Sequence, residues 1–528
     1  MTFLNSADWT VIMVYLAVII GVGMWAARGQ KNTRDYFLGN KNIGWLGIGL
    51  SIVAAETSAL TIIGVPAMAY GDNITFIQLI FGYVIARIIL AVVMVPHYLK
   101  GEIYSPYQLL EQAFGVKTRR WAAGIFLVTE TLAAGVRVYV ASIPVKLILD
   151  QNILAMGTGD PVLGAIILFV FLSLIYTFFG GVKAVIWTDA VQFCLFLAGG
   201  IFTLFYIPTL IDGGVSASLT KAYEHGKLHW FNGQFSLSLP FNIWMGIIGG
   251  TFVVLSTHGA EQLIVQRVLA CKNVADGRKA LITSAVLIFP LFLIFLLCGV
   301  FLWAFYQTHP MQIPLPEPKP GIKANDFIFP IFMVTEVPHV VKGFLIVAIL
   351  SAAMSSISSA LTSLSSVSTM DLLKRLFKAK DEKFIFQFSR WSTVFWALAL
   401  VVVAYLSRAQ DSVLNLSFAL RGVTSGALLG SLILAIRRRP VGSLAVVSGM
   451  AASIAAMSCI HFFLKWQTGI STTGEPTFAK VAWPWFTLIG TFVMLSTAWL
   501  VTTFSSVGRT QFKEWHKPED TSNNKGEG

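Results

Sequence analysis

Five serines crowd the stretch SAAMSSISSAL at 351–361, in the middle of an otherwise apolar run. They fall within about three helical turns, at Ser351, Ser355, Ser356, Ser358 and Ser359. Small side chains let helices pack closely, and hydroxyl oxygens can replace the water around a small cation. Taken alone, the stretch favours tight packing, so the rest of the chain has to decide between the two interpretations.

Several charged side chains also lie within apolar segments, namely Glu56, Arg87, Glu130, Arg137, Asp189 and Arg421. Charges at membrane depth are costly and are functional candidates by default. The alternative is that some of them form structural pairs. Arg87 is the first candidate for such a role, and Glu130 and Arg137 share one helix face two turns apart.

The segment GIGLSIVAAETSALTIIGVPAMAYG has a polar centre at Glu56, Thr57, Ser58 and Thr61, followed by Pro66. A helix that unwinds at this centre frees backbone carbonyls at the midplane, as the broken helices of many secondary transporters do. Carbonyls from this segment and hydroxyls from 351–361 together suit a hard cation such as Na⁺. The two segments therefore predict a sodium site.

The composition is that of a membrane protein built from helices. Of the 528 residues, 55% are hydrophobic and only 12% are charged, against about 25% charged in soluble proteins. The net charge of +12 lies in short loops between apolar spans, so it indicates topology and not nucleic-acid binding. The scattered cysteines form no metal or disulfide pattern, and the histidines form no HExxH grouping, so we expect no enzyme.

Hydropathy predicts about thirteen spanning helices, with centres near residues 18, 56, 87, 133, 170, 196, 253, 292, 352, 397, 424, 452 and 491. Basic residues are concentrated in every second loop, which places the N-terminus outside and the C-terminus inside a cell membrane. We expect one transmembrane domain over 1–505 and a polar cytoplasmic tail over 506–528. The protein is expected to function as a monomer in the lipid bilayer.

Five stretches carry a resemblance to a known family: RDYFLGN (34–40), SPYQLLEQAFG (105–115), GGVKAVIWTDAVQ (180–192), EQLIVQRVLA (261–270) and SAAMSSISSAL followed by TMD (369–371). In this order they resemble the sodium/solute symporter family, from about residue 10 to about 440. The resemblance implies the inverted-repeat fold first seen in the leucine transporter. Two five-helix repeats would then cover about 44–209 and 242–436, with extra helices at both ends.

The resemblance also implies where sodium binds. Its main site would use the carbonyls of Ala54, Thr57 and Ala352 and the hydroxyls of Ser355 and Ser356. Some family members hold a second sodium, and the counterparts of its ligands here are Asp189, Ser355, Ser358 and Ser359. One or two sodium ions per cycle are both open, because the aspartate also occurs in members that are thought to use one.

The family's solute site maps to a set of residues from five spans, namely Glu56, Ser58, Thr61, Phe76, Ile80, Arg137, Thr257 and Arg421. In sialic-acid-type members an arginine near Arg137 holds the solute carboxylate, a task that suits the guanidinium fork. Thr257 stands where sugar transporters have an aromatic gate, and Glu56 replaces an asparagine. These departures weaken a hexose assignment.

The leading hypothesis is a sodium-coupled importer of a small organic solute that carries a carboxylate, such as a sialic acid. A sodium/sugar symporter is the first alternative. A proton-coupled transporter, with Glu56 or Asp189 as carrier, and a transport-linked sensor are further alternatives. Fold alone does not choose the solute.

Overall fold

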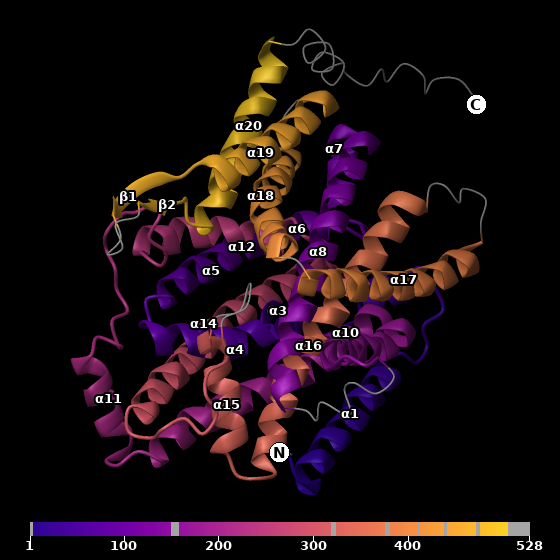
Figure 1. Cartoon of the computed structure of the whole chain (residues 1–528). Coiled ribbons are helices and arrows are strands. Elements are labelled where there is room, and N and C mark those ends of the chain that lie inside the picture. The colour runs from indigo at the N-terminus through magenta and orange to yellow at the C-terminus, as the bar shows by residue number, and fades with distance from the viewer. Residues whose placement is uncertain are drawn as a thin grey trace, which may run out of the picture.

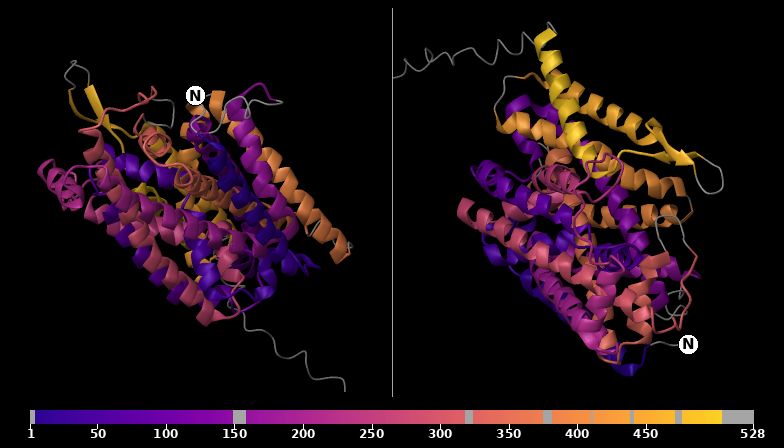
Figure 2. Two further views of the ribbon diagram at one scale, coloured as in Figure 1. Left: turned by 90° about the horizontal axis from the view of Figure 1, so that it is seen from below. Right: turned by 90° about the vertical axis from the view of Figure 1, so that its left-hand side faces the viewer.

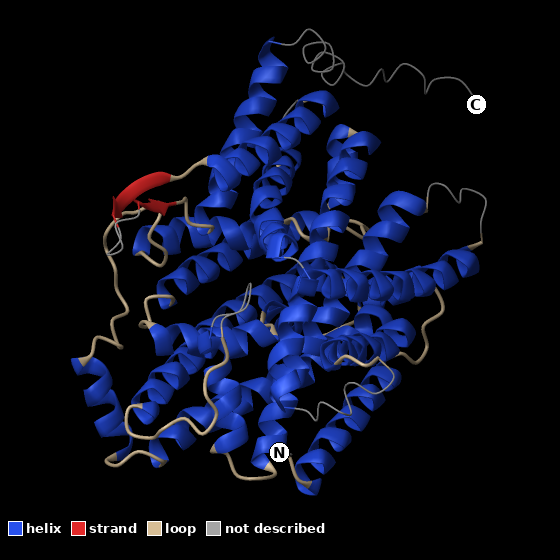
Figure 3. Cartoon of the chain, in the orientation of Figure 1, coloured by secondary structure: helices blue, strands red, loops and turns tan. Residues whose placement is uncertain are grey.

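The computed structural model describes residues 4–148, 158–317, 324–374, 381–409, 411–437, 441–470 and 476–504. Over these residues the chain is helical apart from one short antiparallel hairpin (Figure 3). The expected all-α membrane fold is confirmed in this respect. The predicted tail over 506–528 lies outside the described residues.

Among the described residues, nine helical segments are long and apolar enough to cross a membrane, and one bent pair passes the same test when its two halves are taken together. Each of the thirteen expected centres falls within a helix. Helix α10 contains two of the centres, and two others fall in the shorter apolar helices Met245–Gly259 and Arg421–Ile436. The exact count stays a prediction. The helices that contain these centres are α1 (Ser6–Ala26), α3 (Trp45–Glu56), α5 (Ile77–Ile89), α8 (Val116–Ile148), α10 (Pro161–Thr209), α12 (Gly250–Gly259), α14 (Val274–Tyr306), α16 (Val341–Val367), α17 (Glu382–Ala409), α18 (Asp411–Ile436), α19 (Ser443–Phe463) and α20 (Pro484–Phe504).

Shorter elements connect and extend these helices. They are α2 (Thr33–Leu38), η1 (Gly39–Lys41), α4 (Ala59–Gly71), η2 (Leu90–Met94), α6 (Val95–Tyr98), α7 (Tyr107–Phe114), α11 (Gly214–Glu224), η3 (Met245–Gly249), α13 (Gln262–Leu269), η4 (Ala324–Phe327), α15 (Ile328–Thr335) and η5 (Ser368–Leu373). The hairpin pairs β1 (Trp466–Ile470) with β2 (Pro476–Ala479).

The predicted break in the second span is present. Helix α3 ends at Glu56, Thr57 has an extended backbone, and α4 begins at Ala59. The two halves are bent by 56°. The backbone N–H of Ser58 donates to the hydroxyl of Thr61 at 3.3 Å, which helps to cap the new helix start. Glu56 and Thr57 therefore lie at a break, with helix ends on both sides.

Helix α16 lies inside the bundle, packed against α8, α10 and α17 (Figure 1). The span over Val341–Leu373 contains this helix, and 94% of its most apolar 18-residue stretch is buried. Helix α10 runs along α16 and is kinked at Gly181, whose φ of 49° is left-handed. A Cβ at Gly181 would come within 2.3 Å of the carbonyl oxygen of Tyr36. Glycine is required at this kink both by conformation and by space.

The last three helices, α18, α19 and α20, pack together at one edge of the molecule, and the hairpin extends from them (Figures 1 and 2). Close backbone approach holds α18 against α20. A Cβ at Gly426 would lie 2.5 Å from backbone atoms of Gly490 and Thr491. This crossing is a small-residue contact of the kind that joins helices in membranes.

We expect Gly426→Ala to destabilise the protein, although alanine is the better helix former. The added methyl group has no room at the crossing, and overpacking costs about 1–3 kcal/mol. Thermal unfolding in detergent measures the effect as a lower apparent melting temperature. Gly124→Ala is the matched control, because nothing lies within 4 Å of its added Cβ. Equal melting temperatures for the two variants would contradict the close crossing.

Candidate functional site

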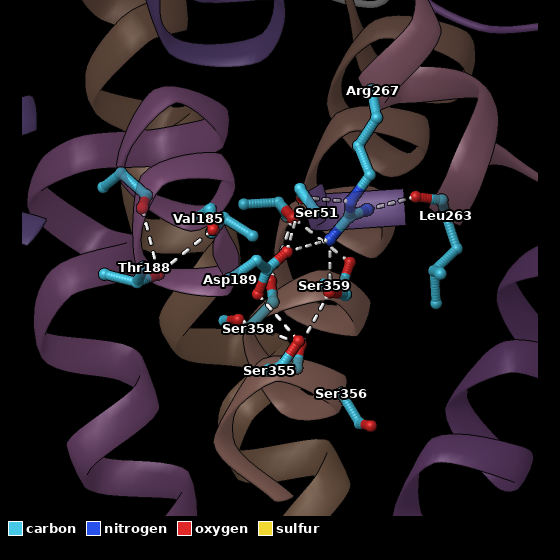
Figure 4. Close-up of polar contacts among 12 residues, drawn as sticks. Ser51, Val185, Thr188, Asp189, Leu263, Arg267, Ser355, Ser356, Ser358 and Ser359 are labelled. Carbon is cyan, nitrogen blue, oxygen red and sulfur yellow. Dashed lines mark hydrogen bonds and ion pairs between the residues drawn. The ribbon is translucent and has the colours of Figure 1, made fainter. Parts of the chain in front are cut away.

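The serines of α16 point to two different sides of the helix (Figure 4). Ser355, Ser358 and Ser359 lie on the side of Asp189, whereas Ser356 points away from that cluster. The hydroxyl of Ser355 donates to Asp189 Oδ1 at 2.8 Å. The hydroxyl of Ser356 donates to the carbonyl of Ala352 at 3.1 Å. Ser356 therefore takes no part in the hydrogen bonds around Asp189.

The first site is a buried ion pair between Asp189 of α10 and Arg267 of α13. Their atoms Oδ2 and Nη2 are 2.7 Å apart, and both side chains are almost completely buried. Ser51 of α3 donates to Asp189 Oδ2 at 2.7 Å and accepts from Arg267 Nε at 2.8 Å. Arg267 also donates to the hydroxyl of Ser359 and to the carbonyl of Leu263. The guanidinium thus lies among residues that the sequence assigned to a second sodium.

The second site is a small cavity of about 10 Å³ beside the break between α3 and α4. Ser58, Arg137 and Ser356 contribute its polar side chains. The hydroxyl of Thr57 at the break is buried and has no hydrogen-bond partner in the described part of the chain. A space of this size holds one water-sized particle. The main sodium site was expected in this region of the fold.

A much larger cavity, of about 920 Å³, extends from the same break. Its walls come from the ends of α3 and α13, from α5, α8, α12 and α18, and from the end of α19, the start of α20 and the segment between them. Of the predicted solute residues, Glu56, Arg137, Thr257 and Arg421 line it. Ser58 lines only the small cavity, and Thr61 and Phe76 line neither of the two.

Phe76 and Thr61 have packing and capping contacts instead. The Phe76 ring lies 5.6 Å from the ring of Phe292 and 5.0 Å from that of Phe241. Thr61 accepts the hydrogen bond that starts α4. Ile80 is fully buried in the core. None of these three side chains therefore lines the large cavity.

Each cation at the inner end of the large cavity has a carboxylate beside it. Glu56 is paired with the fully buried Arg87, and His258 Nε2 lies 3.1 Å from Arg87 Nη2 and 3.6 Å from Glu56 Oε2. Arg421 pairs with Glu261.

Arg137 makes the structural pair that the sequence allowed, with its Nη2 at 3.0 Å from Glu130 Oε1. Its side chain nevertheless keeps 16% of its surface exposed, whereas that of Glu130 keeps 2%. Arg137 lines both the small cavity and the large one. It is the charged side chain that the two cavities share.

On the side away from the α19–α20 connection, a polar network holds the helices together. Asp371 Oδ1 accepts from Arg119 Nε at 2.7 Å and from Ser105 Oγ at 2.6 Å. Gln262 donates to the carbonyl of Tyr104 at 2.7 Å, and Gln266 to that of Phe37 at 3.2 Å. This closed face contains residues of four of the five motifs quoted above.

The sequence reasoning assigned no role to Ser51, Glu261 and Arg267, which the structure brings to these sites. Arg267 and Glu261 lie in the quoted stretch EQLIVQRVLA, which was used only as a motif. The usable signal was the need of a buried carboxylate such as Asp189 for a cation. Among the described residues, no cluster of His, Cys, Asp and Glu could hold a metal ion.

The sequence profile of the Sodium:solute symporter family matches residues 36–463. The chain belongs to this family. It is 30% identical over 460 residues to the sodium/sialic acid symporter NanT of Aliivibrio fischeri, covering 86% of this chain and 87% of that protein. It is 28% identical over 456 residues to the human sodium/iodide cotransporter, covering 85% and 68%.

Among solved structures, the chain is similar to a Na⁺-coupled sialic acid symporter in a substrate-bound outward-open state. The TM-score is 0.82 at 26% identity, over 94% of this chain and 97% of that one. The recognition from five motifs is therefore confirmed. The chain is therefore a sodium-coupled symporter and a multi-pass membrane protein, and it is not an enzyme.

We expect Arg267→Ala to be strongly destabilising, because it leaves Asp189 buried and uncompensated, at a cost of about 3–5 kcal/mol. Adding Asp189→Asn removes the orphaned charge, so the double variant should be more stable than Arg267→Ala alone. Denaturant titration measures the free energy of unfolding of Arg267→Ala, of Asp189→Asn and of the double variant, each against the wild type. Simple additivity of the two single changes would contradict a direct pair.

The control for this cycle is Arg34→Ala. Arg34 is paired with Glu102, but the two side chains are 48% and 50% exposed. Exposed pairs contribute about 0–1 kcal/mol, so this variant should remain close to the wild type.

Proposed function

We propose that this symporter imports a small organic anion with a carboxylate group, and that a sialic acid is the first solute to test. The observation that carries the proposal is the position of Arg137. Its guanidinium borders both the small cavity beside Ser356 and the large cavity. A solute carboxylate bound at Arg137 would offset the repulsion between this guanidinium and a sodium ion in the small cavity, and this offset would couple the two binding events.

We assign the sodium ion to Ala54, Thr57, Ala352, Ser355 and Ser356. The break in the helix supports this, since it frees carbonyls at Ala54 and Thr57. The unpartnered hydroxyl of Thr57 is a further oxygen at the break. The hydroxyl of Ser355 donates a hydrogen bond to Asp189. The lone pairs of its oxygen therefore remain available to a cation.

We infer that one sodium ion is bound in this conformation. A second ion at Asp189, Ser358 and Ser359 would meet the guanidinium of Arg267, which already bonds to Asp189 and Ser359. A sodium ion and the guanidinium of Arg267, both bound to the same carboxylate, would repel each other in a medium of low dielectric. The second sodium of some relatives would have to displace Arg267 here.

The solute is assigned to the large cavity, with Glu56, Arg137, Thr257 and Arg421 on its walls. Arg421 keeps 30% of its side-chain surface exposed and can accept a carboxylate beside its pair with Glu261. Ser58, Thr61 and Phe76 stay predictions for which the cavity walls give no support. The named solutes of two relatives, sialic acid and iodide, are anions.

The large cavity reaches the connection between α19 and α20. With the N-terminus outside, this connection lies outside too, so we propose that the conformation faces outward. The closed network around Asp371 then faces the cytoplasm. We further propose a single transmembrane domain that works as a monomer in the cell membrane, with its two repeats over 44–209 and 242–436.

A second candidate is coupling to protons, which the cluster of Glu56, Arg87 and His258 favours. Its carboxylate and imidazole lie 3.6 Å apart at the wall of the large cavity. A proton could be exchanged between this cluster and the cavity. Sodium and proton coupling are separated by the ion that drives uptake.

The first experiment is uptake of sialic acid into proteoliposomes with a sodium gradient, a proton gradient or neither. We expect uptake with the sodium gradient alone. Ser356→Ala should raise the sodium concentration for half-maximal uptake about tenfold, the effect of losing a contact of about 1.4 kcal/mol. Ser363→Ala is the matched control, because among the described residues that buried hydroxyl bonds only to the carbonyl of Ala360. Uptake driven by protons alone would overturn the sodium assignment.

The role of Arg137 is tested by Arg137→Gln in a Glu130→Gln background, which leaves no buried charge unpaired. We expect the KM for sialic acid to rise at least about tenfold, because a charge-assisted bond is lost. Sodium-dependent thermal stabilisation should persist, since it does not need the solute carboxylate. An unchanged KM would show that the solute does not contact this arginine.

A further inference from the structure

One wall of the large cavity comes from the C-terminal part of the chain. The side chains within residues 460–487 that line the cavity are here called the outer wall, and they are Ile460, His461, Phe462, Lys480, Val481, Trp483, Phe486 and Thr487. The family profile ends at residue 463. Most of the outer wall therefore lies beyond the part of the chain that defines the family.

Lys480, the cation of the outer wall, differs from the cations at the inner end of the cavity. Arg137 and Arg421 are each paired with a carboxylate. For Lys480 and His461 there is no ion pair with any described residue. The segment 441–504 contains a single acidic residue, Glu475, which lies outside the described residues. The outer wall thus presents positive charge to the cavity.

Aromatic surface lies next to this charge. Phe462 and Trp483 are 47% and 46% exposed, and both line the cavity. The His461 ring lies 5.8 Å from that of Phe486, nearly perpendicular to it. Cationic and aromatic side chains together match a solute that has a carboxylate and an apolar or ring-shaped body.

The outer wall is fixed to the rest of the bundle. The backbone N–H of Ala482 donates to the carbonyl of Leu237 at 2.7 Å, and Trp485 Nε1 donates to that of Ser236 at 3.3 Å. Residue Pro484 packs against Gly249, where a Cβ would come within 2.9 Å of the proline carbonyl oxygen. The charged side chains therefore stand on a supported surface, as a binding site requires.

We propose that the outer wall is a second, outer binding station for the anionic solute, which holds it before it reaches Arg421 and Arg137. Lys480 attracts the carboxylate, His461 donates a hydrogen bond, and Trp483 with Phe462 covers the body of the solute. This inference rests on the proposed import of a carboxylate. It adds a site that the sodium-binding core does not contain.

A role as a membrane anchor is the alternative for a lysine and a tryptophan near a membrane surface. Lys465 on the same hairpin provides the comparison. Its ammonium lies over the Phe478 ring at 5.8 Å, and it does not line the cavity. An anchoring role would be shared by both lysines, whereas a role in solute capture belongs to Lys480.

The test is sialic acid uptake by Lys480→Ala, Lys480→Arg and Lys465→Ala in proteoliposomes at constant sodium concentration. We expect Lys480→Ala to raise the KM about five- to tenfold with the maximal rate unchanged, because one charge-assisted contact is lost before translocation. Lys480→Arg should restore the KM, and Lys465→Ala should match the wild type. Choline chloride should raise the wild-type KM and have less effect on Lys480→Ala, since salt screens exposed charges.

Two results would overturn the inference, and they are distinguishable. If the wild type takes up sialic acid and the KM of Lys480→Ala equals that of the wild type at both low and high salt, the outer station is wrong while the proposed function stands. If glucose is taken up with sodium and sialic acid and lactate are not, the carboxylate assignment and the outer station both fail. Equal effects of Lys465→Ala and Lys480→Ala would favour membrane anchoring.

Discussion

Hydrocarbon supplies neither water nor counter-ions, so each charged side chain inside this bundle must find its partner within the protein. Asp189 shows the constraint most fully. Its two oxygens receive one guanidinium and two hydroxyls, from Arg267, Ser51 and Ser355. These partners come from α13, α3 and α16, which are far apart in sequence. The carboxylate is satisfied only when all four helices are together, and this arrangement turns Ser356 toward the break in the second span.

Four of the five motifs that identify the family contribute residues to the polar network around Asp371, although Leu263 and Ile264 of one of them also line the large cavity. Asp371, Gln262 and Gln266 join segments whose separation would open that face. The outer wall of the cavity, by contrast, extends past the end of the family profile. Similarity in the motifs therefore reports how the bundle closes more directly than what it carries. This explains why relatives of similar identity are named for sialic acid, iodide and glucose.

Each of the thirteen hydropathy centres falls within a helix, although the number of spans stays a prediction. The polar centre of the second span predicted the break at its middle, because lipid tolerates exposed backbone only where protein or a cavity lines it. The choice of ion-pair partners could not be predicted in the same way. Glu56 pairs with Arg87 and not with Arg421, since the bend between α3 and α4 decides which helix it faces. Arg267 escaped notice because it lies in a short amphipathic helix between spans, where a basic residue usually indicates only topology.

Helix α16 has a property that concerns how the protein is made. Many of its hydroxyls donate to carbonyls three or four residues earlier in the same helix, among them those of Ser356, Ser358, Ser359 and Thr362. A segment that satisfies its own polar groups can leave the translocon and enter lipid before its partners arrive. Such a helix can be threaded into the bilayer in the order of synthesis. In the folded bundle Ser356 and Ser359 keep these internal acceptors, whereas Ser355 donates to Asp189 of the earlier helix α10.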